Sequence, residues 1–170
     1  MIRILVDSAS DYKMEEIREK GLELVPITIT IGSTDYIDGQ NLDRDGFYEI
    51  LEKTGSFPKT AQPSPQAFLE VFLDAKKKGD ELICILLSSA LSGTCQSAFL
   101  AKSMAAYDKI YIIDSLSATY TIKILADYAL SLVSQGIGAG EIAALLEGLR
   151  SRVRVLEAPD TFDYLERGGR

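Results

Sequence analysis

Residues 82–94 read LICILLSSALSGT, an apolar run followed directly by a turn rich in hydroxyl groups. An apolar run of this length, bounded by turn residues, is typical of a buried parallel strand. A helical pattern begins near Thr94, so the turn lies between a strand and a helix. Such a turn offers hydroxyls and free backbone N–H groups, to which an anion can bind. A helix cap with a tight turn explains the same residues, and this stretch alone leaves both interpretations open.

Outside this stretch, short apolar runs alternate with amphipathic segments. Strands are expected at 2–6, 24–31, 82–87 and 109–113, and 55–63 is expected to be a loop. Five helices with apolar residues on their inward faces are expected between and after these strands. These residues are Phe47, Ile50 and Leu51; Phe68, Val71, Phe72 and Ala75; Ala98, Phe99, Ala101 and Ala105; Ile122, Leu125, Ala126, Ala129 and Val133; Ile142, Leu145, Leu146 and Leu149. The alternation predicts an α/β fold, a parallel sheet covered by helices on both faces.

Three strands end in the same turn chemistry, at Asp7-Ser8, Ser88-Ser89 and Asp114-Ser115. The carboxyl ends of parallel strands meet at one edge of a sheet, where ligands of open α/β folds bind. We therefore expect the three turns to converge on one rim. Asp43 and Ser64 are the expected N-cap residues of two helices, the second with Pro65 at its first position.

The composition excludes several classes of function. The chain has 25 acidic and 18 basic residues and a net charge of −7, so no nucleic-acid partner is predicted. It has no histidine, which removes the Ser-His-acid triad and most zinc sites, and neither a catalytic residue nor a metal is predicted. The sequence contains no apolar run long enough to span a membrane and no recognisable signal peptide. Cys84 and Cys95 form no CxxC motif, and the cytoplasm is the expected location.

The last residues change in character, which predicts a boundary between residues 1–151 and 152–170. Arg152 to Leu156 alternates polar and apolar residues, as a half-buried strand does. After Pro159, a short helix is expected from Asp160 through Leu165. One strand and one helical turn cannot bury their own apolar faces, so this segment is expected to open a second domain.

Six separated stretches carry a family resemblance. They are Asp7-Ser8 with Asp11, Tyr36 through Gly39, Thr60 through Pro65, Ser88 through Ala98, Asp114-Ser115, and Asp160 through Arg170. In this order they resemble the motifs of the DegV family, bacterial fatty-acid-binding proteins that serve fatty acid kinase. Ala61 stands where the family usually has Ser, and Phe162 where it usually has Leu.

The resemblance implies a DegV-type N-terminal α/β domain with the start of a second α/β domain. Family members continue well beyond the Gly-Gly-Arg element, and their second domain supplies much of an acyl tunnel. The chain is therefore expected to be truncated. By resemblance, Thr60 and Ser92 would hold a fatty acid carboxylate through their hydroxyls, with help from the N–H groups of Gly93 and Thr94. Arg170 would lie near the head group.

The resemblance further implies a carrier and not an enzyme. The implied ligand is one long-chain fatty acid, with no other cofactor. The implied partner is a dihydroxyacetone-kinase-like fatty acid kinase that forms the acyl phosphate, and transient membrane contact is compatible with this role. Phe68, Phe72 and Ile122 suit either a tunnel wall or plain core, and core is favoured.

Two alternatives stay open. The first is a serine hydrolase using Ser89 or Ser92, although a histidine, a Gly-x-Ser-x-Gly motif and a local Ser-x-x-Lys are all missing from the sequence. The second is a phosphate- or nucleotide-binding protein, because helix starts bind anions generally. The sequence contains neither GxGxxG nor a Walker A motif, which weighs against that alternative.

Overall fold

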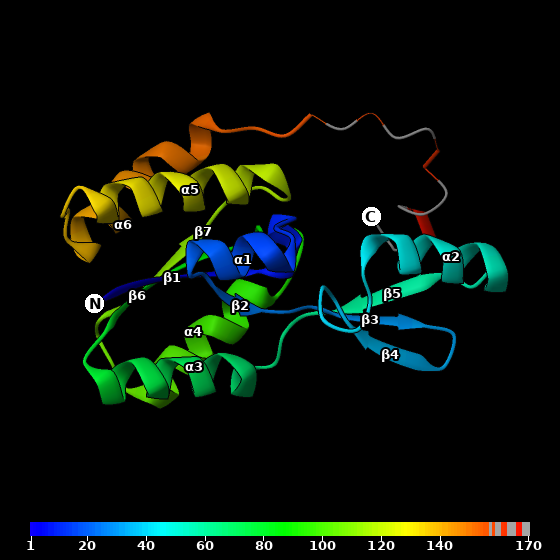
Figure 1. Ribbon diagram of the computed structural model, residues 1–170, viewed down its shortest axis with the longest axis horizontal. Coiled ribbons are helices and arrows are strands. Elements are labelled where there is room, and N and C mark those ends of the chain that lie inside the picture. Colours follow the sequence, from blue (N-terminus) through cyan, green and yellow to red (C-terminus); the bar gives the residue numbers. More distant parts are fainter. Residues whose placement is uncertain (157, 159–160, 163–165, 168–170) are drawn as a thin grey trace.

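The computed structural model describes residues 1–156, 158, 161–162 and 166–167, and its centre is a parallel sheet (Figure 1). The sheet has four strands in the order β2 (Glu23–Val25), β1 (Ile2–Asp7), β6 (Glu81–Leu86) and β7 (Ile110–Asp114). Each neighbouring pair is parallel. The predicted parallel α/β architecture is thereby confirmed.

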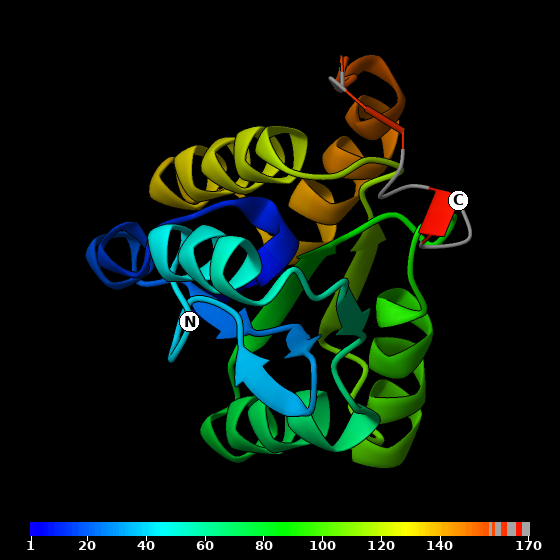
Figure 2. The same ribbon diagram turned by 90° about the vertical axis from the view of Figure 1, so that its right-hand side faces the viewer.

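Helices cover both faces of this sheet (Figures 1 and 2). One face carries α1 (Met14–Lys20), α5 (Tyr120–Ser134) and α6 (Ala139–Leu149). The other carries α3 (Pro65–Lys78) and α4 (Thr94–Ala105). Short 3-10 turns occupy Ser8–Ser10 and Arg150–Arg152.

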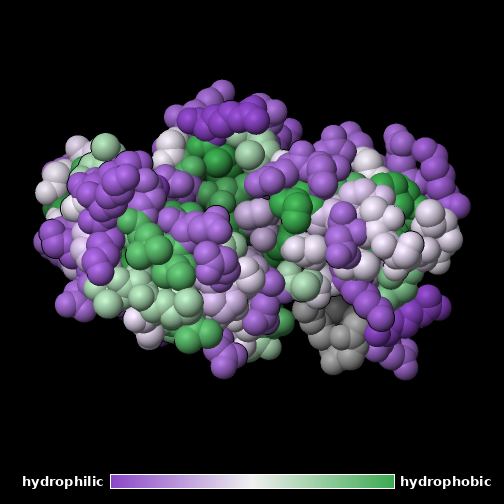
Figure 3. Space-filling model, turned by 90° about the horizontal axis from the view of Figure 1, so that it is seen from below, coloured by the Kyte–Doolittle hydropathy of each residue, from purple (hydrophilic) through white to green (hydrophobic). Residues whose placement is uncertain are grey.

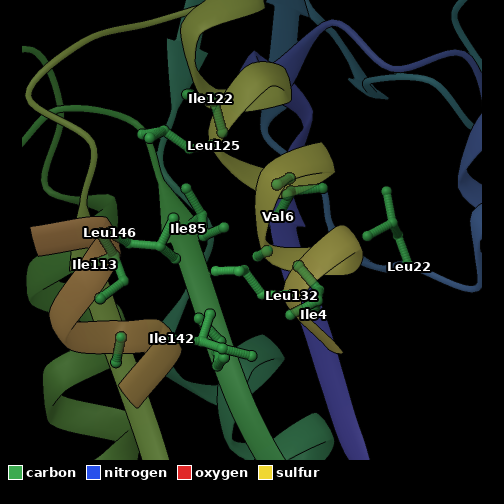
Figure 4. Packing of buried hydrophobic residues seen from close by; sticks show 14 of the residues in the cluster. Ile4, Val6, Leu22, Ile85, Ile113, Ile122, Leu125, Leu132, Ile142 and Leu146 are labelled. Carbon is green, nitrogen blue, oxygen red and sulfur yellow. The ribbon is translucent and has the colours of Figure 1, made fainter. Parts of the chain in front are cut away.

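The side chains of the strands divide between two cores, because successive residues of a strand point to opposite faces. Ile83 and Ile85 of β6 lie in the core beneath α5 and α6, which Figure 4 shows together with Ile122, Leu125 and Leu146. Leu82, Cys84 and Leu86 of β6 pack with the opposite core, which contains Phe68 and Phe72 of α3. Phe68, Phe72 and Ile122 are all fully buried, so the interpretation of these three residues as core is confirmed.

The predicted N-cap residues of two helices are also confirmed. The side chain of Ser64 accepts the N–H of Ala67, Pro65 occupies the first helical position, and Gly79 ends α3 in the left-handed conformation. Asp43 caps α2 (Arg44–Thr54) by accepting the N–H of Gly46. These caps satisfy N–H groups that have no partner within the helix, which is why sequence alone locates them.

Two predictions about strands and loops are wrong. Residues 24–31 are not one strand, because Pro26 has no N–H to continue the ladder after β2. The chain then leaves the parallel sheet and forms β3 (Thr28–Ile31) and β4 (Thr34–Ile37), and the expected loop at 55–63 contains β5 (Pro58–Ala61). These three strands make a second, antiparallel sheet in the order β4-β3-β5. It lies beside the carboxyl ends of the parallel strands, next to α2 (Figure 1).

Three predictions about helix faces need correction. Phe99 is 53% exposed, since it lies next to the buried Ala98 and points away from the sheet. Leu145 is exposed beside the buried Leu146 for the same reason. Phe47, Ile50 and Leu51 of α2 are only half-buried. Figure 3 looks at the underside of Figure 1, where α3 and α4 lie, and shows apolar side chains at the surface among polar ones.

The predicted strand at 152–156 is wrong as well. Residues 150–152 form a 3-10 turn and 153–156 have no regular structure. A strand requires a pairing partner, and none of the strands described for this chain pairs with this segment. Most of the short helix expected from Asp160 through Leu165 falls on residues outside the described part; Glu166 and Arg167, directly after it, are helical, and Glu166 donates its N–H to the carbonyl of Phe162. Residues 159–160, 163–165 and 168–170 lie outside the described part.

No helix within the described ranges is both long and apolar enough to cross a bilayer.

Candidate functional site

The carboxyl ends of β1, β6 and β7 meet at one rim, as their turn residues predict. The carboxylate of Asp7, at the end of β1, accepts the N–H of Leu87 at 2.7 Å and that of Ala9 at 3.0 Å. Asp7 is fully buried. Burial raises the pKa of this carboxyl to about 6, and the two N–H groups oppose the rise by stabilising the ionised form.

A second link joins residues 87–93 between β6 and α4, called here the serine loop, to the end of β7. Ser89 donates its hydroxyl to the carboxylate of Asp114 at 2.6 Å and its N–H to the same carboxylate at 3.2 Å. Ser88 donates its N–H to the carbonyl of Ser117 at 2.9 Å. These contacts use the first two serines to fix the loop. The groups of the loop that remain for a ligand are nearer its end.

The end of the loop forms the start of α4. The hydroxyls of Ser92 and Thr94 lie 2.9 Å apart, and the N–H of Thr94 donates to the Ser92 hydroxyl at 3.3 Å. Thr94 is fully buried and Ser92 is half-buried. Gly93 is the N-cap residue, with no side chain to cap the helix. The first N–H groups of α4 therefore point toward this end of the loop, with the positive end of the helix dipole behind them.

Thr60 reaches the same region from the small sheet. It lies in β5, opposite Ile29 of β3, and is exposed. Two residues later, the side-chain amide of Gln62 donates to the hydroxyl of Ser97 in α4 at 3.3 Å. A Cβ on Gly93 would lie only 2.2 Å from Oε1 of Gln62. The segment that carries Thr60 therefore lies against the start of α4, and neither Thr60 nor Ser92 is buried in a packed interior.

Sequence reasoning assigned no role to Gln62. The glycine directly before the helix is one sequence feature that could have pointed to a close contact at this place. Gly93 has φ −76° and ψ 10°, a conformation open to any L-residue. The requirement for glycine is therefore one of space. Nothing in the sequence says which side chain fills that space.

Arg170 lies outside the described residues. Arg150 lies at the rim, where it donates to the Asp114 carbonyl at 2.8 Å and pairs with Glu147 at 2.6 Å. An open groove of about 600 Å³ runs between residues 88–91, residues 116–118 and residues between 150 and 155. The groove therefore lies beside the rim, between the serine loop and the residues that follow α6.

The site offers little support for hydrolysis. The Ser89 hydroxyl is bound to a carboxylate, and residues 1–170 contain no histidine that could act as its base. Both thiols are buried, and burial raises the pKa of Cys95 to about 12. In the part of the chain that the structure describes, the acidic and cysteine side chains form no group of three or more that could hold a metal ion. Beside the carboxylates of Asp7 and Asp114, the rim presents neutral hydroxyl and N–H donors at the start of α4.

The comparisons with known proteins agree on one family. The model of the DegV family, described as "Uncharacterised protein, DegV family", matches residues 1–170. A DegV domain-containing protein of Caldanaerobacter subterraneus subsp. tengcongensis is 38% identical over 169 residues, which are 99% of this chain and 60% of that protein. A DegV domain-containing protein of Clostridium perfringens is 32% identical over 169 residues and is covered to 61%. The chain thus spans about 60% of the length of these relatives.

Solved structures of DegV family and fatty-acid-binding proteins are also similar to this chain. A DegV family protein from Thermus thermophilus, described with fatty acid binding, superposes with a TM-score of 0.86 at 27% identity, over 99% of this chain and 60% of that one. DegV from Bacillus subtilis, described as a fatty acid binding protein, gives a TM-score of 0.87 at 27% identity, over 99% and 60% of the two chains. A stearic acid-binding protein from Eubacterium ventriosum gives 0.80 at 29% identity, over 86% and 52%.

Proposed function

The chain belongs to the DegV family, and on this premise we propose that the protein binds one long-chain fatty acid by its carboxylate. The Thr60 and Ser92 hydroxyls would donate to the carboxylate, together with the N–H groups of Gly93 and Thr94. Arg170 is proposed to lie near the head group.

One observation carries the proposal. Two segments far apart in the sequence meet at the start of the same helix: the end of β5, where Gln62 follows Thr60 by two residues and donates to Ser97, and the serine loop, which carries Ser92. A carboxylate at this position would gain hydrogen bonds from neutral donors and a favourable interaction with the helix dipole. The N–H of Thr94 already donates to Ser92 over the long distance of 3.3 Å, so it is the weakest of the proposed donors.

The acyl chain would supply most of the affinity. Burying roughly 14 methylenes at about 0.8 kcal/mol each gives an upper bound near 11 kcal/mol, before the costs of association. Burial on this scale requires an enclosed tunnel. Since the chain spans about 60% of its relatives' length, we propose that residues 1–170 alone bind fatty acid much more weakly than the protein at its full natural length.

We further propose that the protein is a carrier that presents its fatty acid to a kinase. A carboxylate oxygen would attack the terminal phosphorus of a nucleoside triphosphate, giving an acyl phosphate and a nucleoside diphosphate. Pairing with a buried cation would lower the nucleophilicity of that oxygen, whereas neutral donors orient it and leave its charge available. The Ser92 and Thr60 hydroxyls are suited to that task.

The experiment is fatty acid binding by the purified protein at its full natural length, with Ser92→Ala and Thr60→Val as variants. Native mass spectrometry identifies a bound acyl chain, and titration with stearic acid gives the affinity. Losing a hydrogen bond to a charged group is expected to weaken binding by about 1.5–3 kcal/mol. Ser103→Ala, on the exposed side of α4, is the matched control and should bind normally.

Each outcome separates the proposal from its alternatives. Unchanged binding in both Ser92→Ala and Thr60→Val would show that the head group lies elsewhere. Turnover of an ester that stops in Ser92→Ala would support a hydrolase instead. A nucleotide adduct in the mass spectrum, in place of an acyl chain, would support the phosphate-binding alternative.

A further inference from the structure

We infer that Gln62 is a positioning residue for the proposed carboxylate site, one that holds Thr60 at a fixed place relative to Ser92. The inference rests on the proposed function and adds a residue to it. Gln62 is assigned no contact with the ligand. It acts through the strand that carries Thr60.

The need for such a residue follows from the way the two sheets are joined. Thr60 belongs to the small antiparallel sheet and Ser92 to the loop after β6 of the parallel sheet. No strand pairing connects the two sheets among the described residues. The distance between the two hydroxyls is therefore set by side-chain contacts and by the connecting segments.

One such contact lies at the end of β1. Ser8 accepts the N–H of Ile27, which lies between β2 and β3, at 3.0 Å. Ser8 is also hydrogen bonded to the carboxylate of Asp38, just after β4. This contact fixes β3 and β4, but β5 lies on the opposite side of β3.

The contact at the β5 side is made by Gln62. Its amide donates to Ser97, which is buried in the first turn of α4, over 3.3 Å. The same amide lies across Gly93, so closely that a Cβ there would be 2.2 Å from Oε1. Pro63 follows and is buried, which restricts the backbone directly after Gln62. Gln62 is thus held between the strand of Thr60 and the helix start that follows Ser92.

This arrangement also explains Gly93. Its backbone conformation is accessible to any L-residue, so the absence of a Cβ serves the amide of Gln62. Because that amide is the far end of a flexible side chain, Gly93→Ala should displace it without large loss of stability. Gly93→Ala and the removal of Gln62 should therefore have the same effect on the position of Thr60, and combining them should add little.

The test compares Gln62→Met with the wild type in stearic acid binding, using the protein at its full natural length. Methionine keeps the length of the side chain but cannot donate to Ser97. We expect binding 3- to 10-fold weaker, as for loss of one neutral hydrogen bond. Ser97→Ala, which removes the acceptor, should weaken binding to a similar degree. Gln66→Met, on the exposed side of α3, is the control and should bind normally.

Two readouts separate positioning from a merely structural role. In a Thr60→Val background, Gln62→Met should have no further effect, because it acts through Thr60. With stearic acid labelled with ¹³C at the carboxyl, the bound carboxyl resonance of Gln62→Met should shift toward that of Thr60→Val. Equal losses with and without Thr60, together with an unchanged resonance, would overturn the inference. So would normal binding by Gln62→Met. Absence of fatty acid binding by the wild type would instead refute the proposed function itself.

Discussion

The carboxylate of Asp7 lies 2.7 Å from the backbone nitrogen of Leu87, and this hydrogen bond ties the end of β1 to the start of the serine loop. Asp7 is fully buried, and this burial raises the pKa of its carboxyl. The loop that carries Ser92 is therefore anchored on one side by a charge that the fold keeps away from water.

Asp7 should make the protein less stable as the pH rises from about 4 to about 6. Burial raises its pKa from 3.8 to about 6, so in this window the folded protein holds a proton that the unfolded chain has lost. The Asp7 carboxyl therefore stabilises the fold most below pH 4, and its contribution falls by roughly 3 kcal/mol up to pH 6 and stays constant above it. Urea unfolding of the wild type and of Asp7→Asn, across this range, measures the difference. A difference between the two proteins that is independent of pH would contradict the assignment.

Phe72→Ala should lower the free energy of unfolding by about 3–5 kcal/mol, because it opens a cavity between α3 and the sheet. Phe72 is fully buried and its ring lies 5.9 Å from that of Phe68, centroid to centroid. Phe99→Ala is the matched control, since its ring is 53% exposed, and it should change stability by less than about 0.5 kcal/mol. Chemical denaturation checks both. Equal losses in the two variants would place Phe99 in the core, as the sequence had suggested.

Ser64→Ala should destabilise the protein by about 1 kcal/mol through loss of the N-cap of α3. The Ser64 hydroxyl accepts the N–H of Ala67 at 3.2 Å. Ser103→Ala, inside α4, should have the opposite sign and stabilise by a few tenths of a kcal/mol, because alanine has the higher helix propensity and the site is exposed. Thermal unfolding followed by circular dichroism compares the two variants. Equal changes in the unfolding temperature of the two variants would show that the Ser64 cap does not stabilise α3.

Neither cysteine should react with a thiol reagent in the folded protein at pH 8. Burial raises the pKa of both thiols, that of Cys95 to about 12, so the reactive thiolate is scarce as well as inaccessible. Titration with a chromogenic disulfide should detect both thiols once the protein is unfolded in guanidinium. Rapid reaction of either thiol under native conditions would contradict this expectation.

The convergence of the three turns could be foreseen because it needs only the direction of the strands. Once β1, β6 and β7 are parallel, their carboxyl ends share an edge, whatever packs above them. The roles within that edge could not be foreseen. Ser89 and Ser92 look alike in the sequence, yet one is bound to Asp114 and the other lies at the helix start.

The sequence by itself determined the parallel sheet, its covering helices and the caps of α2 and α3, because each depends on a pattern within about one element of chain. Tertiary structure alone decided that β5 pairs with β3 and that Gln62 reaches Ser97. The residues of β5 have no apolar alternation of their own and become a strand only beside Ile29 and its neighbours. Contacts between residues 29 and 60, or 62 and 97, depend on how separate elements pack, and packing is a property of the folded chain that no local pattern of residues records.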